Sequence, residues 1–495
     1  MIRLRTITPA LAGLCITAIA HAQGVVRNGY ALSVFFDDAT KGRVDVVCLG
    51  DSNQLHYGGG WDRAWTRALQ RRLGIYATGV TTPGEGGGSG LGVGEGYSTI
   101  ATDGGSFVIG TAPDDVDRYF NAMRADLSPH GYVYLPPGVS TNQTVGIRVF
   151  DYAPFDVHDA LKFHYTYGVF GGGGEGSFQP SVRSEAPPFT EFLRSPIIST
   201  KDGTFGSFKV TTGSLELPAF RRPPHMTFRL SSNASPITGP FVAYGMRIEH
   251  LNSRKGASLN TLYAKGSQSA RDMAAALIAC EDATLTTYFS QVRMLGATRV
   301  LIRINTGVND RNETLASVGP ERVSDGSSPA AYEDNLVAII NRIHEIWRLN
   351  DWDARELHFL ITPSHPRGFP EAEPMLGYRQ AARAIADRFP RIASFDFSRA
   401  VNAFQMVQRH WYYAPFDFNH LSELGFESLS SIELDALMRA AACPADLDDS
   451  GGVDGDDLVE FFVRWESASM DFNSDDTTDG DDVIAFFEAW DRGCE

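Results

Sequence analysis

A short apolar run at residues 44–49 constrains the fold most, because it ends abruptly at Gly50-Asp51-Ser52-Asn53. The run is rich in β-branched and aliphatic residues, is too short for a helix and lacks polar alternation, so it predicts a buried strand of a parallel sheet. Gly50 lets the chain turn sharply, and Ser52 then follows the carboxyl end of the strand, where open α/β sheets place their reactive groups. Ser52 is therefore a candidate nucleophile, with an ordinary strand-to-loop exit as the alternative.

Strand-like and helix-like stretches alternate on both sides of a long β-rich block. Residues 61–73 have apolar side chains at helical spacing, basic residues on the outer face and Gly74 as a stop. Further helices are expected at residues 269–280, 332–349, 378–389 and up to about 441, and further strands at 299–304, 357–361 and 392–397. This alternation predicts an α/β fold with three αβα layers around a doubly wound parallel sheet.

Residues 81–254 follow a different pattern. Stretches such as 163–167 and 226–230 alternate with period two and are separated by Gly, Pro and Ser clusters. This favours a β-sandwich-like domain inserted into an α/β domain made of residues 23–80 and 255–441. Its aromatic side chains could stack on sugar rings, although most are expected to fill the sandwich core.

The amino-terminal 22 residues have the layout of a secretory signal. A basic start is followed by a short apolar run and by Ala20-His21-Ala22, so cleavage is expected after Ala22. The run is too short and too broken for a membrane span, and no other segment is long and apolar enough. The mature protein is therefore expected to be exported, secreted or at the cell surface, with no membrane span.

The net charge of −17 is concentrated near the carboxyl terminus. Residues 443–495 carry 17 acidic and 2 basic side chains, a net charge of −15. The rest of the chain is close to neutral and has no basic stripe, so no nucleic-acid partner is expected.

A serine hydroxyl is a weak nucleophile and needs a base within hydrogen-bond reach. Asp417 stands three residues before His420, in a predicted loop just ahead of the last helix, so one loop can supply both an imidazole and the carboxylate that orients it. A tetrahedral oxyanion also needs donors. Asn309, after a predicted strand, could offer its amide, and Gly266 could offer a backbone N–H. A glycine of the 84–96 loop competes with Gly266.

These motifs resemble the SGNH (GDSL-type) hydrolase family through their order along the chain. Gly-Asp-Ser-Asn follows the first strand, Gly307-x-Asn309-Asp310 follows a later one, and Asp417-x-x-His420 precedes the last helix. The resemblance covers about residues 40–80 and 255–440. It implies a flavodoxin-like αβα fold and hydrolysis of esters through an acyl-serine intermediate, with no cofactor for catalysis.

The resemblance also implies a role for each candidate residue. Ser52 is the nucleophile, His420 the base and Asp417 its orienting partner. The oxyanion hole comprises the Ser52 and Gly266 N–H groups and the Asn309 side chain. Gly266 lies 214 positions after Ser52, so its assignment requires the β-rich block to be an insertion.

Two acidic segments, 446–457 and 471–482, repeat at an interval of 25 residues. Each has the oxygen-ligand spacing of a Ca²⁺ loop and leads into a helix with the pattern Phe-Phe-x-x-Trp. A merely solvated acidic tail would not repeat the aromatic residues. The predicted ligands, which include a backbone carbonyl in each loop, are Asp446, Asp448, Ser450, Gly452, Asp454, Asp457, Asp471, Asn473, Asp475, Thr477, Asp479 and Asp482.

Residues 443–495 resemble a dockerin type I module, which implies docking onto a cohesin-like domain or a cell-surface scaffold. Asp476 departs from the pattern, because it replaces the glycine at the sharp turn of the second loop. Asp tolerates left-handed backbone better than most residues. Cys443 and Cys494 bracket the module and form a candidate disulfide in an oxidising compartment.

Together these features favour a secreted serine esterase that removes O-acyl groups, acetyl above all, from a polysaccharide. A lipase or arylesterase on the same fold is the first alternative; a large apolar lid would favour it, and the sequence shows none. A non-catalytic glycan-binding or scaffold protein is the second. An acyltransferase would share the acyl-enzyme, because a sugar hydroxyl can attack it as water does.

Overall fold

The computed structural model covers the whole chain. The residues that it describes, and to which all structural statements refer, are 25–51, 53, 60–77, 79, 97–100, 133–135, 144–149, 160–171, 176–184, 191–202, 208–219, 226–231, 241–264, 269–310, 328–366, 375–414, 417–447, 452–473 and 477–493.

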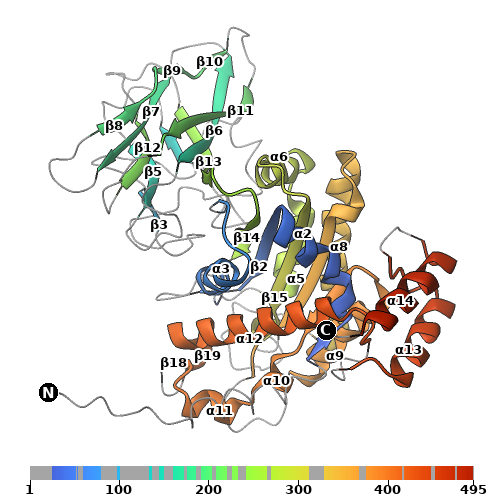
Figure 1. Cartoon of the computed structure of the whole chain (residues 1–495). Coiled ribbons are helices and arrows are strands. Elements are labelled where there is room, and N and C mark those ends of the chain that lie inside the picture. Colours follow the sequence, from blue (N-terminus) through green and yellow to red (C-terminus); the bar gives the residue numbers. More distant parts are fainter. Residues whose placement is uncertain are drawn as a thin grey trace, which may run out of the picture.

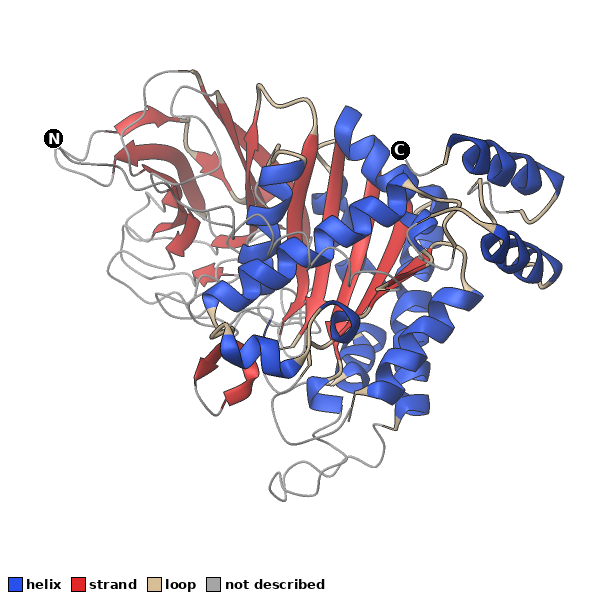
Figure 2. Cartoon of the chain, turned by 60° about the horizontal axis from the view of Figure 1, so that its bottom comes forward, coloured by secondary structure: helices blue, strands red, loops and turns tan. Residues whose placement is uncertain are grey.

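A six-stranded sheet with the order β1-β17-β16-β15-β2-β14 forms the centre of the α/β part (Figure 2). All its strand pairs are parallel except β1 with β17 at one edge. Its strands are β1 (Val26–Arg27), β2 (Arg43–Gly50), β14 (Gly256–Ala264), β15 (Arg299–Thr306), β16 (Leu357–Pro363) and β17 (Ile392–Phe395). The predicted α/β architecture with a parallel sheet is confirmed, and the antiparallel edge strand β1 is an addition to it.

Helices cover both faces of this sheet. Val46 and Cys48 of β2 pack with α2, α3 and α12, whereas Val47 and Leu49 pack with α5, α6, α8 and α9. Successive strand residues point to opposite faces, so a strand covered on both sides must be apolar throughout. The helices are α2 (Ser33–Lys41), α3 (Trp61–Arg72), α5 (Ala270–Ala279), α6 (Asp282–Arg293), α8 (Pro329–Leu349), α9 (Leu376–Arg388) and α12 (Glu423–Ala442).

The chain leaves the parallel sheet after α3 and rejoins it at β14. In between it forms two sheets that are antiparallel except for one short edge strand, and they make a separate lobe in Figure 1. One sheet joins β4 (Val133–Leu135), β6 (Leu161–Gly171), β10 (Lys201–Asp202), β11 (Phe208–Leu217) and β13 (Phe241–His250). The other joins β3 (Tyr97–Ile100), β5 (Thr144–Val149), β7 (Ser177–Ser184), β8 (Glu191–Arg194), β9 (Ile198–Ser199) and β12 (Met226–Ser231).

The two antiparallel sheets face each other across aromatic rings. Phe163 lies 5.5 Å from Phe228 between ring centroids, and Tyr165 lies 5.7 Å from Phe178. Phe163 and Tyr165 belong to β6, whereas Phe228 and Phe178 belong to β12 and β7 of the opposite sheet. All four side chains are buried. These rings therefore fill the core, as expected for most aromatic residues of this region, and leave no face for a sugar.

A buried ionic network joins this lobe to the parallel sheet. Arg247 of β13 donates to Asp45 of β2 at 2.7 Å and to the Val292 carbonyl at 2.7 Å. Alongside it, Arg43 of β2 donates to Glu249 of β13 at 2.6 Å. Asp45 and Arg247 are almost fully buried. Salt and water therefore weaken their interaction much less than they weaken a surface salt bridge. The network lies near the amino end of β2, away from the carboxyl end at Gly50.

Sequence patterning missed several elements of the α/β part, among them α2, α6 and β14. In β14 the apolar run is broken by Ser258 and Asn260, both of which are buried. Their side chains donate to the Asp45 carboxylate, Asn260 at 3.3 Å. The polar residues that concealed this strand are thus the partners of a charge on the neighbouring strand.

The carboxyl-terminal region forms two helices, α13 (Gly455–Glu466) and α14 (Gly480–Arg492). The repeated aromatic residues meet between them, since Phe461 stacks on Phe486 with ring centroids 4.2 Å apart and an angle of 21°. None of the described helices is long and apolar enough to cross a membrane.

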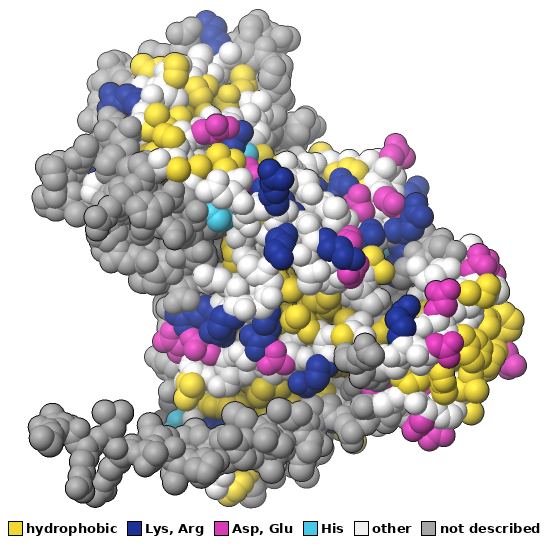
Figure 3. All heavy atoms as spheres, viewed as in Figure 1, with side chains coloured by type: hydrophobic (Ala, Val, Ile, Leu, Met, Phe, Trp, Pro, Cys, Tyr) yellow, Lys and Arg dark blue, Asp and Glu magenta, His cyan; other side chains and the backbone are white. Residues whose placement is uncertain are grey.

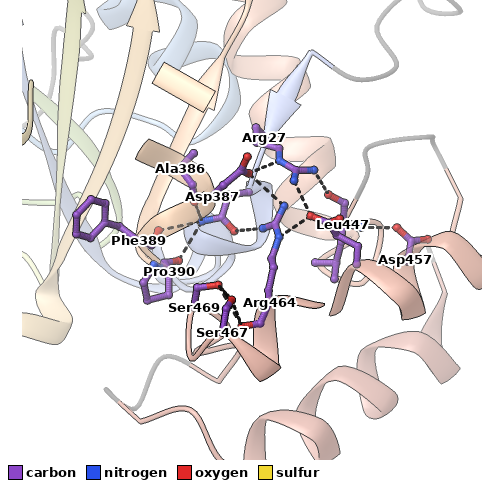
Figure 4. Close-up of polar contacts among 12 residues, drawn as sticks. Arg27, Ala386, Asp387, Phe389, Pro390, Leu447, Asp457, Arg464, Ser467 and Ser469 are labelled. Atoms are coloured by element: carbon purple, nitrogen blue, oxygen red, sulfur yellow. Dashed lines mark hydrogen bonds and ion pairs between the residues drawn. The ribbon is translucent and has the colours of Figure 1, made fainter. Parts of the chain in front are cut away.

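The helix pair is fixed to the α/β part by residues from the start of the chain. Tyr30 is buried in the core of the pair and stacks on Phe472 at 5.4 Å. Beside it, the Asp387 carboxylate of α9 accepts hydrogen bonds from Arg27 and, at 3.4 Å, from Arg464 of α13 (Figure 4). Residues 455–492 therefore pack on the body instead of standing apart from it.

Candidate active site

Three parallel strands end side by side at the candidate site. Gly50, the last residue of β2, is level with Asn305 of β15 on one side and with Ala264 of β14 on the other. Along the chain, Ser52, Asn309 and Gly266 come shortly after these three strand ends. Of these, Ser52 and Gly266 lie outside the described residues.

The residues on either side of Ser52 form a tight, buried turn. The Asp51 carboxylate accepts hydrogen bonds from the Asn53 backbone N–H at 2.9 Å and from its side-chain amide at 3.2 Å. Such a local bond mimics a backbone turn and so fixes how the chain leaves the strand. Burial raises the pKa of Asp51, and the bonds from Asn53 and the charge of His420 oppose this rise only in part. His420 is therefore close enough to the end of β2 to affect Asp51.

Asp417 and His420 lie in a strand, so the predicted loop is wrong in this respect. They belong to β19 (Asp417–Leu421), which pairs with β18 (Tyr412–Ala414) beside one end of α12 (Figure 1). Side chains three apart in a regular strand face opposite ways, but the register here shifts, with four steps in β19 opposite two in β18. Such bulges re-aim side chains and are common next to active sites. The Asp417 side chain lies outside the described residues, and His420 is half-buried.

The segment after β15 turns at Gly307, whose φ is +122°. A side chain there would be strained, and a Cβ atom would lie 2.8 Å from the Met375 methyl group. The next amide, Val308 N–H, donates to the Ser364 hydroxyl at 3.1 Å. Asn309 follows and is 92% buried, with a relative exposure of 8%. The predicted amide donor therefore sits on a sharply turned segment that the neighbouring strand β16 supports.

A second buried network lies under the candidate site and was not predicted. Arg303 of β15 and Glu433 of α12 are both fully buried and pair at 2.8 Å. The Glu433 carboxylate also accepts from Trp65 at 2.8 Å and from Thr362 at 2.7 Å. The Arg303 guanidinium lies over the rings of Trp61 and Trp65, at 4.9 and 4.8 Å. An arginine inside an otherwise apolar strand was the available sequence signal.

The two acidic repeats have the same local geometry. Asp457 is fully buried and accepts from the Leu447 N–H at 2.6 Å and the Asp454 N–H at 2.8 Å. Its counterpart Asp482 is also fully buried and accepts from the Phe472 and Asp479 N–H groups at 2.6 and 2.8 Å. In each repeat the final acidic residue thus ties the loop's beginning to its end.

The remaining predicted ligands divide into described and undescribed ones. Asp446, Gly452, Asp454, Asp471, Asn473, Thr477 and Asp479 are described, whereas Asp448, Ser450 and Asp475 are not. Within the described part of the chain, no three His, Cys, Asp or Glu side chains gather as a metal site. Cys443 is disulfide-bonded; its predicted partner Cys494 lies outside the described residues, so that pairing stays a prediction.

The fold and the converging strand ends define an open α/β protein whose candidate site lies at the carboxyl edge of a parallel sheet. No protein-family model matches the sequence, and no curated protein is similar to it. Among solved structures, a peptidoglycan O-acetylesterase shares 12% sequence identity with a TM-score of 0.50, and the match covers 84% of this chain and 99% of that one. The chain therefore shares its fold with an esterase.

Two further structures are less similar. A family two carbohydrate esterase from Clostridium thermocellum, in complex with cellohexaose, has 11% identity and a TM-score of 0.23, covering 62% of this chain and 98% of that one. The CBM22-1 xylan-binding domain from Paenibacillus barcinonensis has 8% identity and a TM-score of 0.23, covering 36% and 99%. These scores are too low to show a common fold.

Proposed function

We propose that this protein is an exported serine esterase that removes O-acyl groups, acetyl above all, from a polysaccharide. One observation carries the proposal. The ends of β2, β14 and β15 meet at one edge, and the field of His420 reaches Asp51, the neighbour of Ser52. These two findings support the proposal that the nucleophile, the base and the oxyanion donors come together at this edge.

The proposed reaction uses these groups in two steps. His420 takes the Ser52 hydroxyl proton as Ser52 Oγ attacks the ester carbonyl, while Asp417 holds the imidazole in the productive orientation. The tetrahedral oxyanion is stabilised by the Ser52 and Gly266 N–H groups and the Asn309 amide. Collapse breaks the bond to the sugar oxygen, which takes the proton from His420 and leaves as a hydroxyl. Water, deprotonated by His420, then attacks the acyl-serine, and Ser52 Oγ takes the proton back from His420 as the carboxylic acid is released.

The glycan substrate is proposed from the shared fold. The esterase that this chain resembles is named for O-acetyl groups of peptidoglycan. The expected signal peptide, ending at Ala22, would deliver this chain to the compartment where polysaccharides lie.

The test is acetate release from acetylated xylan, pectin, chitin and peptidoglycan, with long-chain esters in parallel. Wild type should release acetate from at least one glycan, and Ser52→Ala and His420→Ala should not. Ser214→Ala is the matched control, because Ser214 is exposed on β11. Cleavage of long-chain esters alone would favour the lipase alternative. Full activity in Ser52→Ala would exclude Ser52 as the nucleophile.

We also propose that residues 443–495 bind one Ca²⁺ in each acidic loop. All the predicted ligands are oxygen atoms, which suits a hard cation. Each loop ends in a buried carboxylate, Asp457 in the first loop and Asp482 in the second. Calcium would supply structural stability and take no part in ester hydrolysis. Addition of Ca²⁺ should raise the melting temperature and EDTA should lower it. The absence of both effects would contradict the proposal.

A cohesin-like domain or a cell-surface scaffold is the proposed partner of this region. Its support is an apolar surface on the outer sides of α13 and α14, where hydrophobic side chains gather with acidic side chains around them (Figure 3). Val459 and Phe462 of the first repeat are exposed, as are Ile484 and Phe487 at the equivalent positions of the second. Replacing Phe462 and Phe487 by Ser should abolish retention on the scaffold without changing esterase activity.

A further inference from the structure

We propose that Asp310 is a positioning residue, which holds the Asn309 amide in place relative to the start of α5. This inference rests on the proposed function. Asp310 is fully buried, and the sequence motif contains it without assigning it any role. Its carboxylate bonds to both of the elements that flank the candidate oxyanion hole.

The contacts of Asp310 form a clasp. Both carboxylate oxygens accept from the backbone N–H of Ala270, at 3.0 and 3.1 Å, and one also accepts from the Thr306 hydroxyl at 3.2 Å. Ala270 is the first residue of α5, and Thr306 is the last residue of β15. The clasp therefore joins the end of β15 to the beginning of the helix that follows β14, the strand on the other side of β2.

Asn309 lies between two fixed points. Upstream, the Val308 N–H is held by Ser364; downstream, Asp310 is held by Ala270. A donor stabilises an oxyanion only when it is already aimed before the charge develops. A displacement of about 1 Å can cost about 100-fold in rate, even when the change lies outside the reacting groups. The clasp is the feature that fixes the orientation of the Asn309 amide.

The helix end also explains why a negative charge is tolerated beside an anionic transition state. The start of a helix carries a partial positive charge from its unpaired N–H groups. The Asp310 carboxylate lies directly on one of these groups, so the local positive potential offsets its charge. Asn in this position would keep one acceptor oxygen but lose the negative charge and the second acceptor.

A purely structural role, capping α5, is the competing explanation, and Asp272 provides the control. Asp272 caps the same helix end through the Ser269 N–H at 2.9 Å and the Ser269 hydroxyl at 2.8 Å. None of its bonds in the described structure reaches the segment of Asn309. The two carboxylates thus share capping and differ in the clasp.

The experiment compares Asp310→Asn with Asp272→Asn in steady-state ester hydrolysis and thermal unfolding. Asp310→Asn should lower kcat by about 10- to 100-fold with KM changed by less than about two-fold. Asp272→Asn should lower the melting temperature comparably while kcat stays within about two-fold of wild type. Equal losses of kcat in both variants would overturn the inference. If Asp310→Asn does not fold, Thr306→Val weakens the same clasp and should reduce kcat several-fold.

A double-mutant cycle isolates the connection to Asn309. Asn309→Ala should cost much less in the Asp310→Asn background than in wild type, because its amide is then already misplaced. Strictly additive losses would overturn the inference. A wild-type protein that hydrolyses no ester would overturn the proposed function together with this inference. An active wild type whose kcat survives Asp310→Asn would overturn this inference alone.

Discussion

Removing the charge of Glu433 should be among the most destabilising isosteric changes in the α/β part. The side chain is fully buried and accepts four hydrogen bonds. Two come from Arg303 at 3.1 and 2.8 Å, one from Trp65 at 2.8 Å and one from Thr362 at 2.7 Å. Glu433→Gln keeps the volume but leaves the buried guanidinium without a counter-ion. It also turns one acceptor into a donor that faces other donors.

The expected cost follows from these contacts. Breaking a buried ion pair by removing one partner typically costs about 3–5 kcal/mol, because the remaining charge stays desolvated. Each additional donor left without an acceptor costs about 1–3 kcal/mol, although relaxation recovers part of this. Glu433→Gln should therefore lower the free energy of unfolding by about 4 kcal/mol. Cation–π contact with Trp61 and Trp65 remains and prevents a larger loss.

The assay is urea unfolding, followed by tryptophan fluorescence. The double variant Arg303→Met/Glu433→Leu is the decisive comparison, because it removes both charges together. It should be less destabilised than Glu433→Gln, since buried pairs can be replaced by apolar residues at little cost. A decrease of less than about 1 kcal/mol in the free energy of unfolding of Glu433→Gln would refute the reasoning. So would a double variant whose decrease equals the sum of those in Arg303→Met and Glu433→Leu.

Three further predictions concern other buried contacts. Burial lowers the pKa of His358 from 6.5 to about 4, so between these pH values the folded state binds fewer protons than the unfolded state. The free energy of unfolding should therefore fall by about 3 kcal/mol as the pH is lowered from 6.5 to 4. This fall should be absent in His358→Gln. Tyr30→Ala should expose the segment after α12 to limited proteolysis, whereas Tyr30→Phe should not, because this buried hydroxyl has no hydrogen-bond partner among the described residues. Gly425→Ala should lower both the melting temperature and kcat, because the added Cβ would lie 2.1 Å from the Trp411 carbonyl oxygen, beside the hairpin that carries His420. Gly455→Ala is the control and should change neither quantity, because the space around Gly455 is open.

Much of the fold could be predicted because its signals are local. The apolar run that ends at Gly50 and the helical spacing of residues 61–73 each report on one element at a time. Their alternation then determines the α/β class, and the order of Ser52, Asn309 and His420 along the chain marks the candidate site. The repeated Phe461 and Phe486 likewise predict two equivalent helices.

Only the tertiary structure shows the polar side chains that connect these elements. Glu433 and Arg303 are 130 residues apart, and Asp45 and Ser258 are 213 apart. In the sequence, each of these polar residues resembles a surface position or a break in an apolar strand or helix. Its partner is not visible in the local pattern. Asp310 is the same case at the site, since its role depends on a helix that starts 40 residues earlier in the chain. Apolar periodicity is a property of one segment, whereas a buried polar group is satisfied only by a partner that folding brings to it.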